Sequence, residues 1–249
     1  MAALPLLTGI LGTAKSGDHP ALPPSTKGVL FICLWELLAF AVIYSLAWLA
    51  SRATKDDLLL RWRPGFWVLP LGVAYSMGIR IVAGVSMAVV YGAIAVSGMV
   101  SQTKLEQFTE ANRPKVEVLV DVHALANDPV YFWLNVTLVS LVVAGLREEL
   151  WRSAFLAGLR SIWPKSFEGT RGGLFAAAIA ALFFGLAHFP QGVLAVVLAT
   201  LLGLGLGAIM VLHRSIWPAV LAHGFFDATS FALIPFALHL KQLGGHLGG

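Results

Sequence analysis

Residues 28–50 read GVLFICLWELLAFAVIYSLAWLA, an apolar run in which Glu36 is the only charged residue. An α-helix rises 1.5 Å per residue, so about 20 apolar residues are needed to cross the roughly 30 Å hydrocarbon core of a bilayer. The run is long enough, and its apolar residues are continuous rather than alternating, which favours a spanning helix over a barrel strand. This stretch therefore predicts an integral membrane protein built from helices.

Five further apolar runs follow the first. The second lies within 65–100 and is long for one span, so the helix is tilted, extends out of the membrane or breaks near Pro70. The other four are predicted over 131–157, 172–189, 192–212 and 216–238. The expected fold class is all-α, a polytopic transmembrane bundle with six spans, or seven to eight if the second run or the termini divide further.

The composition supports this interpretation. Of the 249 residues, 58% are hydrophobic and 12% are charged, whereas a soluble domain carries about 25% charged residues. Lipid must therefore cover much of the surface. We expect residues 1–249 to form a single integral membrane domain, with an interfacial segment at 1–27, an extramembrane loop at 101–130 and the motif-bearing helices at 131–238. The only cysteine, Cys33, excludes an intrachain disulfide.

The basic residues lie mainly in the connections, which indicates contact with anionic lipid headgroups and not with nucleic acid. With six spans, the side that the positive-inside rule makes cytoplasmic carries Arg52, Lys55, Arg61, Arg63, Arg160, Lys165, Arg171 and Arg214. The opposite side carries Lys15, Lys27, Lys104, Arg113, Lys115 and Lys241, so the bias is weak.

Nine ionisable residues fall inside the predicted spans, where charge is costly and usually functional. Glu36 and Arg80 lie at similar distances from the loop that joins their spans, so we expect them to form a neutralising ion pair. The other seven are Arg147, Glu148, Glu149, Arg152, His188, His223 and Asp227. Their types and spacings suggest chemistry.

Glu148 and Arg152 are four residues apart and share one helix face, while Glu149 points about 100° away. We therefore expect Arg152 to hold one carboxylate ionised while the other finds a different partner. His223 and Asp227 are also four apart, so the carboxylate can orient the imidazole. His188 lies at a predicted helix end, two residues before Pro190.

Acidic and imidazole groups on three apolar helices suit hydrolysis of an amide. A glutamate sheltered from bulk water can act as a general base toward a water molecule, and imidazoles can donate hydrogen bonds to the oxyanion. Ser153 is not surrounded by a nucleophile-elbow motif. Two histidines and a glutamate could hold zinc, but the HExxH signature is absent, so no cofactor is favoured.

Each residue also has a purely structural interpretation, as a helix staple or an interfacial side chain. Two other functions remain open. The first is a non-catalytic membrane scaffold, or an immunity or regulatory protein, of the same fold. The second is a proton-coupled transporter, although no inverted repeat or pair of broken helices supports it.

The segments REELWRS (147–153), FFGLAHF (183–189) and HGFFDA (223–228) resemble, in this order, the CAAX-protease and bacteriocin-processing (CPBP, or Abi) family of intramembrane endopeptidases. The family pattern is EExxxR, then FxxxH, then HxxxN or HxxxD. The resemblance implies that Glu148 and His188 activate water, that His223 and Asp227 form the oxyanion site, and that Glu149 and Arg152 support them. It also implies a peptide or protein substrate, prenylated or not, in contact with membrane lipids. The location that it implies is the inner (plasma) membrane of a bacterium.

The first motif is one residue short, because Glu148, Glu149 and Arg152 give EExxR instead of EExxxR. A local bulge or a wider turn beside Gly145 would reconcile the two registers. The shortened spacing leaves two candidates for the base, and we prefer Glu148 to Glu149.

Overall fold

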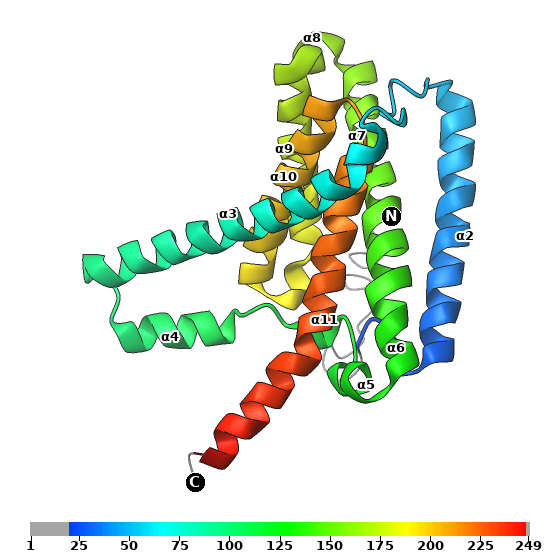
Figure 1. Ribbon diagram of the computed structural model, residues 1–249. Coiled ribbons are helices and arrows are strands. Elements are labelled where there is room, and N and C mark those ends of the chain that lie inside the picture. Colours follow the sequence, from blue (N-terminus) through cyan, green and yellow to red (C-terminus); the bar gives the residue numbers. More distant parts are fainter. Residues whose placement is uncertain (1–19, 248–249) are drawn as a thin grey trace, which may run out of the picture.

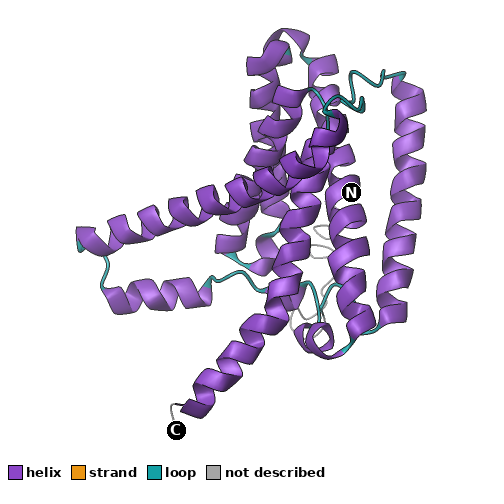
Figure 2. Cartoon of the chain, viewed as in Figure 1, coloured by secondary structure: helices purple, strands orange, loops and turns teal. Residues whose placement is uncertain are grey.

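The computed structural model describes residues 20–247, with side chains up to residue 240, and this part of the chain is helical without a β-strand (Figures 1 and 2). Six of its helices are long and apolar enough to cross a membrane, which confirms the predicted all-α fold and the count of six spans. Most of the interfacial segment predicted at 1–27 lies outside the described residues.

The spans agree closely with the apolar runs. The first is α2, and the second is the 3-10 turn η1 followed by α3. The third is a composite of α6, the π-helix η3 and α7, and the last three are α9, α10 and α11. Their bounds are Thr26–Ser51 (α2), Gly65–Trp67 (η1), Val68–Ser97 (α3), Pro129–Leu134 (α6), Asn135–Glu148 (η3), Glu149–Ile162 (α7), Gly169–Ala187 (α9), Val193–His213 (α10) and Trp217–Leu247 (α11).

The second span does not break at Pro70. This residue occupies the first turn of α3, where a backbone N–H has no partner within the helix, so proline costs nothing there. The long run is accommodated by a helix that crosses the bundle at a steep angle and projects from it (Figure 1). Of the three alternatives, the break near Pro70 is therefore wrong, because α3 is continuous from Val68 to Ser97.

The connection predicted as a loop at 101–130 contains two short helices and a 3-10 turn. It holds α4 (Gln102–Ala111), the 3-10 turn η2 (Val116–Val118) and α5 (Val122–Asn127). Its backbone pairs with the turn η4 (Phe189–Gln191): the Lys115 N–H donates to the Gln191 carbonyl over 2.9 Å. The connection thus fastens the segment that follows His188. A short helix α8 (Pro164–Phe167) joins α7 to α9.

The wider turn expected beside Gly145 is present as η3, a π-helix of 14 residues that ends at Glu148. π-Helical turns are rare and frequently occur at functional sites. The Ser140 hydroxyl donates to the Asn135 carbonyl five residues earlier, over 2.7 Å, in keeping with the π spacing. Gly145 lies against α11, where a Cβ atom would come within 2.8 Å of the Val220 carbonyl oxygen. Glycine is required for this close approach of η3 and α11.

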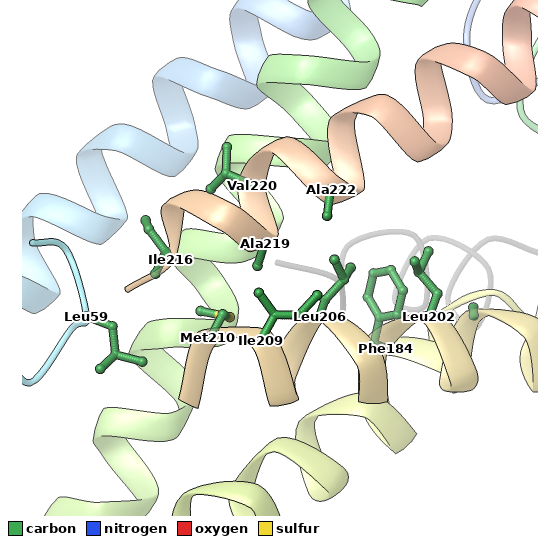
Figure 3. Close-up of a cluster of buried hydrophobic side chains, with 11 residues drawn as sticks. Leu59, Phe184, Leu202, Leu206, Ile209, Met210, Ile216, Ala219, Val220 and Ala222 are labelled. Carbon is green, nitrogen blue, oxygen red and sulfur yellow. The ribbon is translucent and has the colours of Figure 1, made fainter. Parts of the chain in front are cut away.

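The core lies where α9, α10 and α11 meet. Figure 3 shows its side chains, with Phe184 from α9 beside Leu202 and Leu206 from α10, and with Ala219 and Ala222 from α11 facing them. Helix α10 presents small residues to α9, since Gly203 and Gly207 lie against Ala181 and Ala177. Small residues let these helices pack backbone to backbone, as is common in membrane bundles.

Three basic connections lie together at one end of the bundle. Arg160 donates to the Asp57 carbonyl over 2.8 Å, and the Ser215 hydroxyl donates to the Arg61 carbonyl over 2.9 Å. The loop after α2, the end of α7 and the turn before α11 are therefore neighbours, as the six-span topology requires.

Candidate active site

His223 is the centre of the site. Its ring is almost fully buried on α11, and its two nitrogens face different carboxylates. Nδ1 lies 2.8 Å from Oε1 of Glu149, while Nε2 lies 3.9 Å from Oε2 of Glu148 and 3.8 Å from Oδ2 of Asp227. Three carboxylates thus surround one imidazole. The spacing predicted that Asp227 would orient this ring, but the carboxylate in hydrogen-bond contact is Glu149.

Glu149 and Arg152 form the inner layer. Both side chains are completely buried and form an ion pair within the first turn of α7. The guanidinium of Arg152 also lies over the ring of Phe184, 4.9 Å from its centroid. Glu149 is held by its ion pair with Arg152 and accepts a hydrogen bond from His223, so it fixes the orientation of the imidazole and keeps a proton on Nδ1.

The predicted face shared by Glu148 and Arg152 is wrong. Glu148 is the last residue of the π-helix and Glu149 the first of α7, so the regular α-helical spacing starts one residue later than expected. Arg152 therefore pairs with the glutamate three residues before it, and Glu148 turns toward Arg147, whose guanidinium donates to Glu148 over 3.1 Å.

The predicted pair of Glu36 and Arg80 is also wrong. Glu36 on α2 pairs with Arg147 over 2.6 Å, because α2 packs against α6 and η3. Glu36, Arg147 and Glu148 form a continuous charged row at the edge of the site, with Arg147 between the two carboxylates.

Arg80 lies on α3, which packs against α11. Its guanidinium donates to the Phe226 carbonyl and to the hydroxyls of Thr229 and Ser230, and lies 4.0 Å from the centroid of the Phe226 ring. Arg80 therefore holds α3 against the turn of α11 that carries Asp227.

His188 is close to the site but less directly tied to it. It caps the C-terminal end of α9, as predicted, and its Nδ1 lies 2.8 Å from the Phe184 carbonyl oxygen. The Phe184 ring contacts both imidazoles, with centroids 4.7 Å from His188 and 5.8 Å from His223. Within the part of the chain that the structure describes, His188 has no carboxylate in ion-pair contact.

The arrangement provides a rigid inner layer and an accessible outer one. Glu149 and Arg152 are sealed from solvent, whereas the side chains of Glu148 and Asp227 are 27% and 28% exposed. The gaps of 3.8 and 3.9 Å between Nε2 and these carboxylates are too long for direct hydrogen bonds, and separations of this size are often bridged by water. Among residues 20–240, no three His, Cys, Asp or Glu side chains are placed to hold a metal ion.

Two contacts of the site escape prediction from the sequence. The link between Glu36 and Arg147 joins α2 to the site, and the Phe184 ring is a shared contact of Arg152, His188 and His223. Both Glu36 and Phe184 occupy conspicuous positions, since Glu36 is the only charge in its span and Phe184 precedes His188 by one helical turn. Spacing along the chain does not reveal Arg147, Arg152 and His223 as their partners, because these lie on other helices.

Residues 129–229 match the family model described as type II CAAX prenyl endopeptidase Rce1-like. The matched segment includes all six candidate site residues, namely Glu148, Glu149, Arg152, His188, His223 and Asp227. This match confirms the resemblance predicted from the three motifs. No curated protein and no solved structure has a significant match to the chain.

Proposed function

We propose that this protein, whose residues 129–229 match a family of membrane-bound prenyl endopeptidases, is itself an intramembrane endopeptidase. Its substrate would be a peptide, or the tail of a protein, that is held at the membrane. Prenylated substrates are the class suggested by the family description, and unprenylated membrane peptides are the alternative.

The observation that carries this proposal is the environment of His223. One ring nitrogen is anchored to the buried Glu149, and the other faces two partly exposed carboxylates that lie 3.8 and 3.9 Å away, too far for direct hydrogen bonds. A purely structural histidine would not require a second and a third carboxylate around its free nitrogen. The arrangement instead suits a general base beside a fixed imidazole.

In the proposed mechanism, Glu148 takes a proton from a water molecule while the oxygen of that water attacks the carbonyl carbon of the scissile bond. The protonated Glu148 then delivers the proton to the leaving nitrogen as the C–N bond breaks. His188, at the end of α9, would assist in holding the water. Glu148 is preferred to Glu149 because it is accessible, whereas Glu149 is fully buried and already bound by Arg152 and His223.

The oxyanion that forms during this attack would accept a hydrogen bond from His223 Nε2 in the doubly protonated ring. Glu149 supports this form of the ring through Nδ1. An ionised Asp227 cannot donate a hydrogen bond to the oxyanion. In this form it would stabilise the proton on His223 Nε2, and in its protonated form it would itself donate a hydrogen bond to the oxyanion.

One observation favours the non-catalytic alternative. Glu148 is already paired with Arg147, which also binds Glu36, so its carboxylate takes part in a structural ion-pair network. A scaffold that retains the bundle would preserve such a charged row without turning over a substrate.

The test is proteolysis by the purified full-length protein in detergent micelles. Two peptides of the same sequence, one farnesylated on a cysteine near its C-terminus and one unmodified, would be incubated with the protein, and products identified by mass spectrometry. We expect cleavage that is abolished in Glu148→Gln and His223→Ala and strongly reduced in His188→Ala. Cleavage by all three variants at the rate of the unmodified protein would refute the proposed site. Metal analysis of the active protein would decide whether zinc takes part.

A further inference from the structure

We propose that the protein has a lipid-binding site, separate from the cluster around His223, that accepts one phospholipid with an anionic headgroup. The site is a cavity of about 550 Å³ between the second half of α2 and α7. This volume lies within the usual range for ligand pockets, about 300–1,000 Å³. Figure 1 shows α2 standing beside the column formed by α6, η3 and α7.

The hollow is a consequence of side-chain size. On α2 the lining residues include the aromatic Tyr44 and Trp48, and on α7 they include Ala154, Ala157 and Gly158. Positions 154, 157 and 158 lie on one helix face, so α7 offers no large side chain where it faces the aromatics of α2. A Cβ atom on Gly158 would have no neighbour within 4 Å. The space is therefore left open by the sequence itself.

The cavity has a polar, cationic end. Arg52 and Arg160 line it where α2 and α7 reach the basic end of the bundle. Arg160 is bonded only to backbone carbonyls, those of Asp57 and Leu156. Neither arginine pairs with a carboxylate among the described residues, in contrast to Arg61 and Arg63, which share Asp56. Two arginines without a direct ion pair therefore lie at one end of the cavity, where the single carboxylate in the lining is that of Asp57. The lining keeps a net positive charge at this end.

A further polar group lies deeper in the cavity. The hydroxyl of Tyr44 is buried and has no hydrogen-bond partner within the described part of the chain. A buried hydroxyl without a partner is unfavourable, which marks this part of the α2–α7 contact as incompletely packed.

These features match a phospholipid better than a free anion. The phosphate would lie between Arg52 and Arg160, and an acyl chain would cover the walls formed by Tyr44, Trp48 and the small residues of α7. Basic pockets between spanning helices are known to hold anionic lipid headgroups. The inference does not depend on the proposed peptidase activity, because no residue of the His223 cluster lines the cavity.

The test uses native mass spectrometry of the full-length protein, delipidated in detergent and then titrated with dioleoylphosphatidylglycerol. Dioleoylphosphatidylcholine and inorganic phosphate are titrated in parallel. We expect one tightly bound phosphatidylglycerol, much weaker phosphatidylcholine and no retained phosphate. Removing each arginine should weaken phosphatidylglycerol binding about fivefold, following the approximate contribution of one basic residue near an anionic lipid surface.

The variants separate charge from shape. Arg52→Gln and Arg160→Gln remove the cations, Arg160→Lys retains one, and Gly158→Leu fills the space without a backbone clash. Arg171→Gln, outside the cavity, and Gly92→Leu, at an open position of α3, are the matched controls. Size-exclusion profiles identify variants that do not fold.

The expected pattern is loss of phosphatidylglycerol in Gly158→Leu and weakened binding in the arginine-to-glutamine variants, with binding retained in Arg160→Lys and in both controls. Unchanged binding in Gly158→Leu would show that the lipid lies elsewhere. Equal affinity for phosphatidylcholine would overturn the role of the arginines. Retention of phosphate alone would show a site for a free anion and overturn the lipid assignment.

Discussion

Glu148 and Glu149 are adjacent in sequence but occupy opposite environments. Glu149 is sealed between Arg152 and His223, whereas Glu148 remains partly exposed at the end of the π-helix. This division lets one carboxylate hold the imidazole while the other stays available to water. A general base contributes about 10²- to 10⁴-fold to the rate of such reactions.

The two glutamates should therefore give different phenotypes when changed to glutamine. Glu148→Gln should abolish peptide cleavage. The variant should unfold at nearly the same temperature as the unmodified protein, because a partly exposed ion pair contributes at most about 1 kcal/mol to the free energy of unfolding. Activity assays and thermal unfolding in the same detergent make the comparison. Cleavage at the normal rate by Glu148→Gln would assign the base to another residue.

Glu149→Gln should instead destabilise the fold. It leaves the guanidinium of Arg152 buried without a counter-charge, and breaking a buried ion pair in this way costs about 3–5 kcal/mol. The expected result is a clear fall in unfolding temperature that accompanies any loss of cleavage. An unfolding temperature equal to that of the unmodified protein would contradict the structural role given to Glu149.

Phe184 is expected to position the site without taking part in the reaction. Its ring contacts Arg152 and both imidazoles, so Phe184→Leu should lower kcat about tenfold to a hundredfold through misplacement of these groups. The neighbouring Phe183→Leu, exposed on the same helix, is the control and should be close to normal. Equal effects of the two substitutions on kcat would remove the positioning role.

At the scale of elements, the π-helix determines the register of the site. It delivers Glu148 at its last residue, so that α7 begins with Glu149 and places Arg152 one turn further on. The contact between η3 and α11 passes through Gly145 and Gly224, neither of which has room for a side chain. The spacing between the glutamates and His223 therefore depends on glycine.

Gly145→Ala should move α11 away from η3. The added methyl group would meet the backbone of Val220 and Gly224, and overpacking of this kind costs about 1–3 kcal/mol. We expect a lower unfolding temperature and a loss of cleavage. Gly84→Ala, at an open position on α3, controls for the general effect of alanine on a helix. Normal stability and activity in Gly145→Ala would show that the close contact is dispensable.

The sequence predicted the elements better than their contacts. Apolar runs mark spans reliably because lipid imposes length and composition on each helix by itself. Ion-pair partners depend on how the helices pack. For this reason the spacing predicts a pair between Glu36 and Arg80, whereas in the structure Glu36 pairs with Arg147. The short EExxR spacing did indicate an irregular turn, but only the observed π-helix shows that Arg152 pairs with Glu149.

At the scale of the whole molecule, the polar segments divide between two ends. The loop after α2, the end of α7 with α8, and the turn before α11 form a basic end. The connection with α4 and α5 meets η4 at the other end, where Arg113 is paired with Glu110 and Glu117. Arg113 lowers the pKa of Glu117, so this carboxylate stays ionised under mildly acidic conditions.

This division predicts the orientation in the membrane. Lys and Arg in short loops favour the cytoplasmic side, so the basic end should be inside the cell and the α4–α5 connection outside. Single cysteines introduced as Lys165→Cys and Lys104→Cys, each in a Cys33→Ser background, should react differently with a membrane-impermeant maleimide on intact cells. Lys104→Cys should be labelled at once, and Lys165→Cys only after the cells are permeabilised. The reverse labelling pattern would place the α4–α5 connection on the cytoplasmic side. The arginine-lined end of the α2–α7 cavity would then face the outside, and lipids or substrates confined to the cytoplasmic leaflet could not reach it.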